Sequence, residues 1–139
     1  MTDRPIGVVV IGRNEGERLK RCLASILAQH QGPVVYVDSG SSDGSVEYAQ
    51  SVGVDVVDLD MTRPFTMARG RNAGLNYLVE QYPECQFVQF VDGDCEIVDG
   101  WISNACEFLL ANPKTISVCG NRMERYPEAT LYNKLINME

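Results

Sequence analysis

The chain has 139 residues, of which 45% are hydrophobic and 22% charged, and 12 Lys and Arg residues against 19 Asp and Glu residues give a net charge of −7. This length fits one domain, and the composition is typical of a soluble globular protein. The negative charge argues against a nucleic acid or an anionic membrane as the main partner. The longest apolar runs are too short to span a bilayer, and no signal-peptide pattern is visible.

The cysteine pattern indicates a reducing compartment. Five cysteines form an odd number and include no C-x-x-C pair, so we interpret them as reduced thiols, several of them in or near the core, of a cytoplasmic protein. His30 is the only histidine and no metal-ligand spacing occurs, which argues against a zinc site.

The first half of the chain alternates β-branched runs of strand length with helical patterns. The first helical segment carries apolar residues at i, i+3, i+4, i+7 and i+8, which predicts one apolar face made by Leu19, Cys22, Leu23, Ile26 and Leu27. The predicted elements are a strand over 6–12, a helix over 15–30, a strand over 34–38, a short helix ending near Val52 and a strand over 54–60.

The second half continues this alternation. It predicts a helix over 67–81, a strand over 86–92, a helix over 99–112 and a fifth strand over 115–120. Strands that alternate with helices imply βαβ units. We therefore predict an α/β fold, Rossmann-like in architecture, with a mostly parallel open sheet and helices on both faces.

Polar clusters follow three of the predicted strands. They read GRNEGE after the first strand, DSGSSDG after the second and DGDCE after the fourth. In open α/β sheets ligands bind beyond the carboxyl ends of the strands. Three polar loops converging on that edge therefore predict a binding site there.

Asp92 and Asp94 stand at the end of an apolar strand with only Gly93 between them. Asp-Gly is a common turn pair, so a turn is the simplest explanation. Two such carboxylates can also hold a hard divalent cation, Mg²⁺ or Mn²⁺, whose remaining ligands come from substrate phosphates and water. Since carboxylates are costly to bury, their position favours the functional explanation.

Asp38 also ends an apolar strand, which favours a functional acid that accepts hydrogen bonds from a base N–H or from sugar hydroxyls. Asp43 directly precedes the short helix, so capping that helix is the better explanation for it.

Arg69 and Arg71 lie among helix formers, with Gly70 and Gly74 interrupting the pattern. Arginines of this kind usually form a solvated face. Glycine inside a helix costs about 1 kcal/mol relative to alanine, however, so the two glycines indicate close approach of something anionic or of another backbone. No dinucleotide fingerprint and no P-loop motif is present.

Four segments, 8–26, 37–45, 68–74 and 90–101, together resemble the nucleotide-sugar-binding half of a family 2 glycosyltransferase of the GT-A fold. The resemblance extends from about residue 6 to residue 125. It depends on four motifs in the correct order, each of which would be weak alone.

The resemblance implies a nucleotide-diphospho-sugar donor, most often a UDP-sugar, together with Mg²⁺ or Mn²⁺ and an acceptor that the sequence does not identify. Asp94 would be the main metal ligand, and Asp92 would bridge the ribose or the metal. Asp38 would contact the base. The remaining residues placed at the donor are Arg13, Asn14 and Glu15 in the base pocket and Arg69 and Arg71 near the nucleotide.

The same resemblance places the catalytic base and the acceptor site in a downstream part. We therefore predict a donor-binding domain over 1–126, no catalytic residue in this chain, and a helix over 127–139 that leads into the acceptor part. Such a fragment is expected to be inactive in transfer, and its open sheet edge predicts self-association into a homo-oligomer.

Two alternatives remain. One is a non-catalytic nucleotide-sugar-binding module. The other is a phosphatase of the haloacid dehalogenase type, which would need the D-x-D motif on its first strand instead of its fourth.

Overall fold

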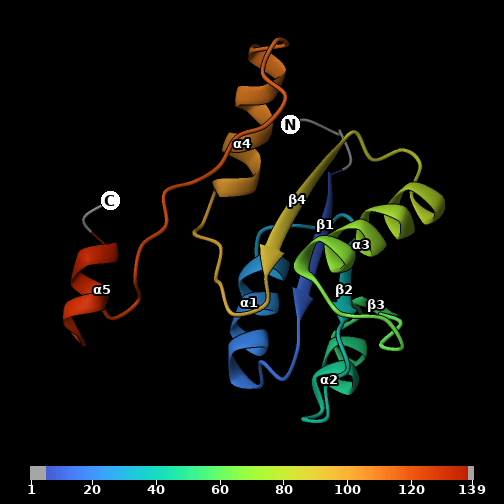
Figure 1. The fold of residues 1–139 in the computed structure, drawn as a ribbon. Coiled ribbons are helices and arrows are strands. Elements are labelled where there is room, and N and C mark those ends of the chain that lie inside the picture. Colours follow the sequence, from blue (N-terminus) through green and yellow to red (C-terminus); the bar gives the residue numbers. More distant parts are fainter. Residues whose placement is uncertain (1–5, 138–139) are drawn as a thin grey trace. The chain divides into compact units, whose positions relative to one another are not determined.

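A computed structural model describes residues 6–137. Four parallel strands form one sheet in the order β3-β2-β1-β4. Strand β1 (Ile6–Gly12) lies between β2 (Val34–Asp38) and β4 (Phe87–Asp92), and β3 (Asp55–Asp58) follows β2 (Figure 1). The predicted α/β class with a parallel open sheet is confirmed.

Helices cover both faces of this sheet because side chains alternate along β1. Val8 and Val10 face α1 (Glu17–Leu27) and α2 (Ser45–Ser51), and all of them contribute to one buried apolar cluster. The intervening Val9 and Ile11 form a second cluster with residues of α3 (Met67–Gln81). Because both faces are covered, β1 consists of apolar residues and glycine instead of alternating with polar ones.

The apolar face predicted for the first helix is nearly correct. Its buried residues are Leu19, Cys22, Leu23 and Ile26, and only Leu27 is exposed, at 38%. The helix begins at Glu17, later than predicted, because Gly16 adopts a positive φ of 54° and ends the preceding loop.

Gly74 explains how α3 approaches the sheet. A Cβ atom at this position would overlap the Val9 side chain and would lie 3.0 Å from Val37 Cγ2. The glycine therefore serves close packing of the helix on β1 and β2, which is the backbone-approach explanation given for it above. Gly70 is less restricted, since a Cβ there would lie 3.4 Å from Ile11 Cγ2, an ordinary contact.

The chain divides into two compact units, Met1–Ile102 and Ser103–Glu139, and the sheet belongs to the first. Helix α4 (Trp101–Ala111) begins at the end of the first unit, and α5 (Leu131–Ile136) lies in the second. The helix predicted over 127–139 is shorter than expected, since it begins at Leu131, after the N-cap Thr130, and ends at Ile136. The last two residues of the predicted range, 138–139, lie outside the described residues.

The fifth strand predicted over 115–120 is wrong. These residues have no strand structure, and Ile116 is 97% exposed. The apolar pattern is suitable for a strand, but a strand also needs a hydrogen-bonded partner, and within the described chain β4 pairs only with β1.

No disulfide joins the cysteines within residues 6–137, and the cysteines do not all belong to the core. Cys22 and Cys106 are buried, Cys85 is half-buried, and Cys95 and Cys119 are exposed. Among residues 6–137, no helix has the length and apolarity required to cross a membrane.

The two glycines of α3 allow a matched test of packing. Gly74→Ala should lower the free energy of unfolding by about 1–3 kcal/mol, because the added methyl group overpacks the contact with β1. Gly70→Ala should be neutral or should stabilise the helix by up to about 1 kcal/mol. Chemical denaturation of both variants measures this difference, and equal unfolding free energies would contradict the packing argument.

Candidate functional site

A cleft of about 160 Å³ opens at the carboxyl edge of the sheet, where the sequence predicted a site. It lies entirely within the first unit. The ends of β1, β2 and β4 and the start of α3 contribute its lining, which consists of Ile11, Gly12, Arg13, Glu15, Ser39, Phe65, Met67, Gly70, Asp92, Gly93 and Asp94.

The loops after β1 and β2 are joined by side-chain to backbone hydrogen bonds. Asn14, in a left-handed conformation with φ of 53°, accepts from Ser42 N at 2.7 Å through Oδ1, and its own N–H donates to Ser41 Oγ at 2.9 Å. Asp43 accepts from Gly16 N at 2.9 Å and from Ser45 N, the first residue of α2, at 3.1 Å. Asn14 and Asp43 therefore fix the shape of this side of the cleft. Asp43 has a structural role, as predicted, but the N-cap of α2 is Gly44, and Asp43 contacts the start of the helix from the residue before it.

Asp38 is 3% exposed and organises the loop that follows β2. One carboxylate oxygen accepts from Tyr36 Oη at 2.8 Å, and the other accepts from Gly40 N at 3.0 Å and Ser41 N at 2.7 Å. Burial, the largest effect on Tyr36, raises the pKa of its phenol, so the hydroxyl remains a donor to Asp38. These three bonds compensate for burying the carboxylate.

Asp92 and Asp94 lie on either side of Gly93, whose N–H donates to Ile11 O at 2.8 Å. This bond holds the turn after β4 against the end of β1. A Cβ at Gly93 would lie only 3.0 Å from the same carbonyl oxygen, so the position favours glycine. Arg71, from α3, donates to Asp92 Oδ1 at 2.9 Å, with both side chains partly exposed.

Several carboxylates lie near Glu15 and affect the pKa of its side chain. Burial raises the pKa of its carboxyl group, and the nearby carboxylates of Asp94, Asp43 and Asp92 raise it further. Arg18 acts in the opposite direction, with its guanidinium 2.8 Å from Glu15 Oε2. The cleft lining thus holds three carboxylates, those of Glu15, Asp92 and Asp94, and one guanidinium, that of Arg13, which favours a cation over a phosphate.

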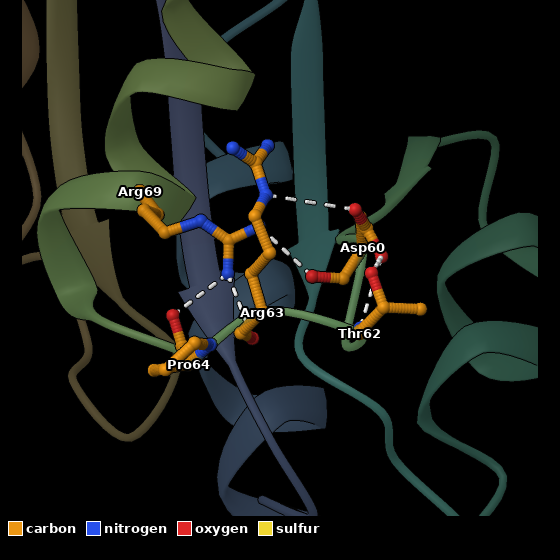
Figure 2. A network of polar contacts seen from close by, with 5 residues as sticks. All are labelled: Asp60, Thr62, Arg63, Pro64 and Arg69. Carbon is orange, nitrogen blue, oxygen red and sulfur yellow. Dashed lines mark hydrogen bonds and ion pairs between the residues drawn. The ribbon is translucent and has the colours of Figure 1, made fainter.

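The Arg69 side chain is held by the loop that precedes α3 (Figure 2). Its guanidinium donates to three backbone carbonyl oxygens of the loop before α3, those of Asp60 at 2.8 Å, Arg63 at 3.1 Å and Pro64 at 2.8 Å. It is held by that loop, whereas Arg71, one half-turn further along α3, bonds to Asp92.

The structure brings four of the predicted residues, Arg13, Glu15, Asp92 and Asp94, into the lining of one cleft. The other four, Asn14, Asp38, Arg69 and Arg71, lie behind or beside it in the contacts described above, and their contact with a ligand stays a prediction. The sequence reasoning missed Ser39, Phe65 and Met67. An apolar aromatic residue just before the predicted start of α3 could have drawn attention to Phe65.

The chain matches the family model of glycosyl transferase family 2 over residues 7–138. This match covers nearly the whole chain, and the chain therefore belongs to that family. No curated protein sequence matches it.

Solved structures with the same fold include TarS of S. aureus and glucosyl-3-phosphoglycerate synthase of Mycobacterium tuberculosis. TarS of S. aureus, residues 1–349, is 21% identical with a TM-score of 0.66, over 87% of this chain and 40% of that chain. TarS in complex with UDP is 24% identical with a TM-score of 0.63, over 77% and 32%. The chain thus spans less than half the length of these structures, whose GT-A fold it shares.

The second enzyme is glucosyl-3-phosphoglycerate synthase of Mycobacterium tuberculosis in complex with Mn²⁺, UDP and phosphoglyceric acid. It is 22% identical with a TM-score of 0.59, over 79% of this chain and 40% of that chain. At this level of identity the similarity establishes the fold.

The hydrogen bonds of Asp38 predict different outcomes for two substitutions. Asp38→Ala should lower the free energy of unfolding by at least about 2 kcal/mol, because it leaves two N–H groups and a buried hydroxyl without their acceptor. Asp38→Asn should cost less than about 1 kcal/mol, since its amide oxygen can accept both N–H groups and its NH₂ can donate to the Tyr36 hydroxyl. Thermal and urea unfolding compare the two, and an equal loss would show that the negative charge itself is required.

Proposed function

We propose that the chain is the donor-binding part of a metal-dependent, inverting glycosyltransferase that uses a nucleotide-diphospho-sugar, with UDP as the nucleotide. The observation that carries this proposal is the pair Asp92 and Asp94 in a cleft at the carboxyl edge of the sheet, in a chain of glycosyl transferase family 2. The UDP complexes of TarS and of glucosyl-3-phosphoglycerate synthase support the choice of nucleotide.

The carboxylates fit a hard divalent cation that is shared with a ligand. Among residues 6–137, no group of three or more His, Cys, Asp or Glu side chains is arranged to hold a metal. Two carboxylates are nevertheless enough for Mg²⁺ or Mn²⁺ when a diphosphate and water complete the coordination shell. The Mn²⁺ in the mycobacterial enzyme's structure supports this cofactor. A bound cation would offset the charge that develops on the departing diphosphate.

Some residues of the chain are proposed to contact the metal or the nucleotide, and others to hold those residues in position. Asp94, which is exposed, is proposed as the main metal ligand, and Asp92 as the residue that bridges ribose or metal. Arg71 holds Asp92 through the 2.9 Å bond and brings positive charge next to the acidic cleft. Arg13 and Glu15 line the base side, and Asp38 would receive a hydrogen bond from the base through a lone pair left free by its three present donors.

The phosphatase alternative is disfavoured by the position of the motif. Asp92 and Asp94 follow β4, an outer strand of the described sheet, and the first strand, β1, ends in Gly12 without an acid. The binding-module alternative differs from our proposal only in transfer chemistry, and it predicts the same donor binding by residues 1–139.

Metal dependence of donor binding is the first test. UDP should bind more tightly with Mn²⁺ or Mg²⁺ than with EDTA, because the acidic cleft repels a diphosphate unless a cation lies between them. Asp94→Ala should remove most of that difference. Calorimetric titration measures both, with GDP and dTDP as nucleotide controls. Equal UDP affinity in EDTA would refute the metal role.

Transfer itself should not occur at a useful rate in residues 1–139. A general base must come within hydrogen-bonding distance of the acceptor hydroxyl. Of the three acids that line the cleft, Asp92 pairs with Arg71, Glu15 pairs with Arg18, and Asp94 is assigned above to the metal. Outside the cleft, Glu128 pairs with Lys134 at 2.7 Å. Release of UDP from UDP-sugars with Mn²⁺ and an acceptor-rich lysate should remain far below about 1 per second. Turnover at that rate would place the base within this chain.

A further inference from the structure

We propose that Arg69 is a positioning residue: it holds the loop over residues 60–66 so that Phe65 forms an aromatic wall of the cleft, against which the nucleobase stacks. This inference rests on the proposed function, since it needs a nucleotide in the cleft. It assigns to Arg69 a role different from direct contact with the nucleotide, and it assigns a ligand contact to Phe65.

Arg69 forms hydrogen bonds with the residue before Phe65 and with the residue after it. The guanidinium donates to Pro64 O at 2.8 Å, directly before Phe65, and the Arg69 backbone N–H donates to Thr66 Oγ1 at 3.1 Å, directly after it. Both neighbours of Phe65 are thus fixed by one residue. The bonds to Asp60 O and Arg63 O extend the same support back to the start of the loop (Figure 2).

The rest of the loop is ordered by its own contacts. Asp60 Oδ1 accepts from Thr62 N at 2.9 Å and from Thr62 Oγ1 at 2.6 Å (Figure 2). Met61 lies beside Gly40, where a Cβ would be 3.4 Å from Met61 Cγ. The loop is therefore built against the β2–α2 loop at one end and against α3 at the other, and Arg69 joins its parts.

Phe65 is the only aromatic residue in the cleft lining of the described chain, and it is 43% exposed. An exposed aromatic ring in a concave polar site offers a π-face to a flat ligand. Stacking of a base on such a ring typically changes affinity by about ten-fold or more. Because a loop side chain stacks well only when its backbone is held, the support from Arg69 would set the strength of this contact.

Direct contact between Arg69 and phosphate is the competing explanation, and the two differ in which ligands they affect. A phosphate contact matters for UDP and not for uridine, which carries no phosphate. A wall formed by Phe65 contacts the base and therefore contributes equally to the affinities for uridine and UDP. The comparison of uridine with UDP therefore separates the two explanations.

The experiment measures dissociation constants for uridine and UDP, by NMR titration and calorimetry in the same Mg²⁺ buffer. The variants are Arg69→Gln, Arg69→Lys, Phe65→Leu and the double variant Phe65→Leu with Arg69→Gln. Arg63→Gln is the matched control, because it removes one positive charge from the same loop, where Arg63 Nε lies 3.7 Å from Asp60 Oδ2, and leaves the carbonyl contacts of Arg69 in place.

We expect Arg69→Gln to raise the dissociation constants of uridine and UDP by the same factor, about three- to ten-fold. Phe65→Leu should raise both by about ten-fold. The double variant should be no weaker than Phe65→Leu alone, since the two residues act through one contact. Arg69→Lys should resemble Arg69→Gln, because lysine keeps the charge without the planar fork. Hydrogen exchange of residues 60–66 should become faster in both Arg69 variants and stay unchanged in Arg63→Gln.

Three results would overturn the proposal. The first is a loss of affinity in Arg69→Gln that affects UDP and not uridine. The second is UDP affinity in Arg69→Lys equal to that of the unaltered chain. The third is a loss of affinity in the double variant equal to the sum of the two single losses. If the unaltered chain binds neither uridine nor UDP, the proposed function fails and not this inference alone. Faster exchange of residues 60–66 would in that case still confirm that Arg69 supports the loop.

Discussion

The parallel pairing of β1 with strands on both sides is the constraint on which the rest of the structure depends. It places Gly12 opposite Asp38 and Ile11 opposite Asp92 in the two ladders. Neighbouring strands are about 4.8 Å apart, so three loops that are far apart in the sequence begin within a few ångströms of one another. Both faces of β1 are buried, through Val8 and Val9 and the residues that follow them, so this edge of the sheet lies directly against the apolar core.

The polar residues at this edge perform two kinds of work. Some build the loops: Asp38 holds the turn after β2, and Asn14 and Asp43 join the loops after β1 and β2. Others, such as Asp92 and Asp94, line the cleft. Asp38, Asn14 and Asp43 accept hydrogen bonds from backbone N–H groups that would otherwise lack partners. These bonds allow loops with little apolar content to keep one conformation. A substitution among them would alter ligand binding without any direct contact with the ligand.

Charge in the cleft connects this architecture to the proposed chemistry. Burial and nearby carboxylates raise the pKa of Glu15. The cleft lining holds the carboxylates of Glu15, Asp92 and Asp94 against the one guanidinium of Arg13, with Arg18 and Arg71 paired to two of the acids. A diphosphate alone would be repelled, so a divalent cation and the donor would be expected to bind in a coupled way. Arg71 would contribute to that coupling, because the oxygen of Asp92 that it contacts is also a candidate ligand for the cation.

The sequence by itself determined the features that local patterns encode. The bounds of β1, β2 and α3 agree with the prediction because buried β-branched runs, a helical pattern and turn residues mark them locally. The α/β class and the convergence of polar loops followed from the same alternation. Tertiary structure decided what depends on partners. The segment 115–120 has a strand-like pattern but no strand to pair with. The Arg69 guanidinium donates to carbonyl oxygens of residues that precede it by 5 to 9 positions. Phe65, in the loop that these bonds hold, lines the cleft. Periodicity shows which side chains avoid water, but a hydrogen bond between distant groups forms only where the whole fold brings a donor to an acceptor.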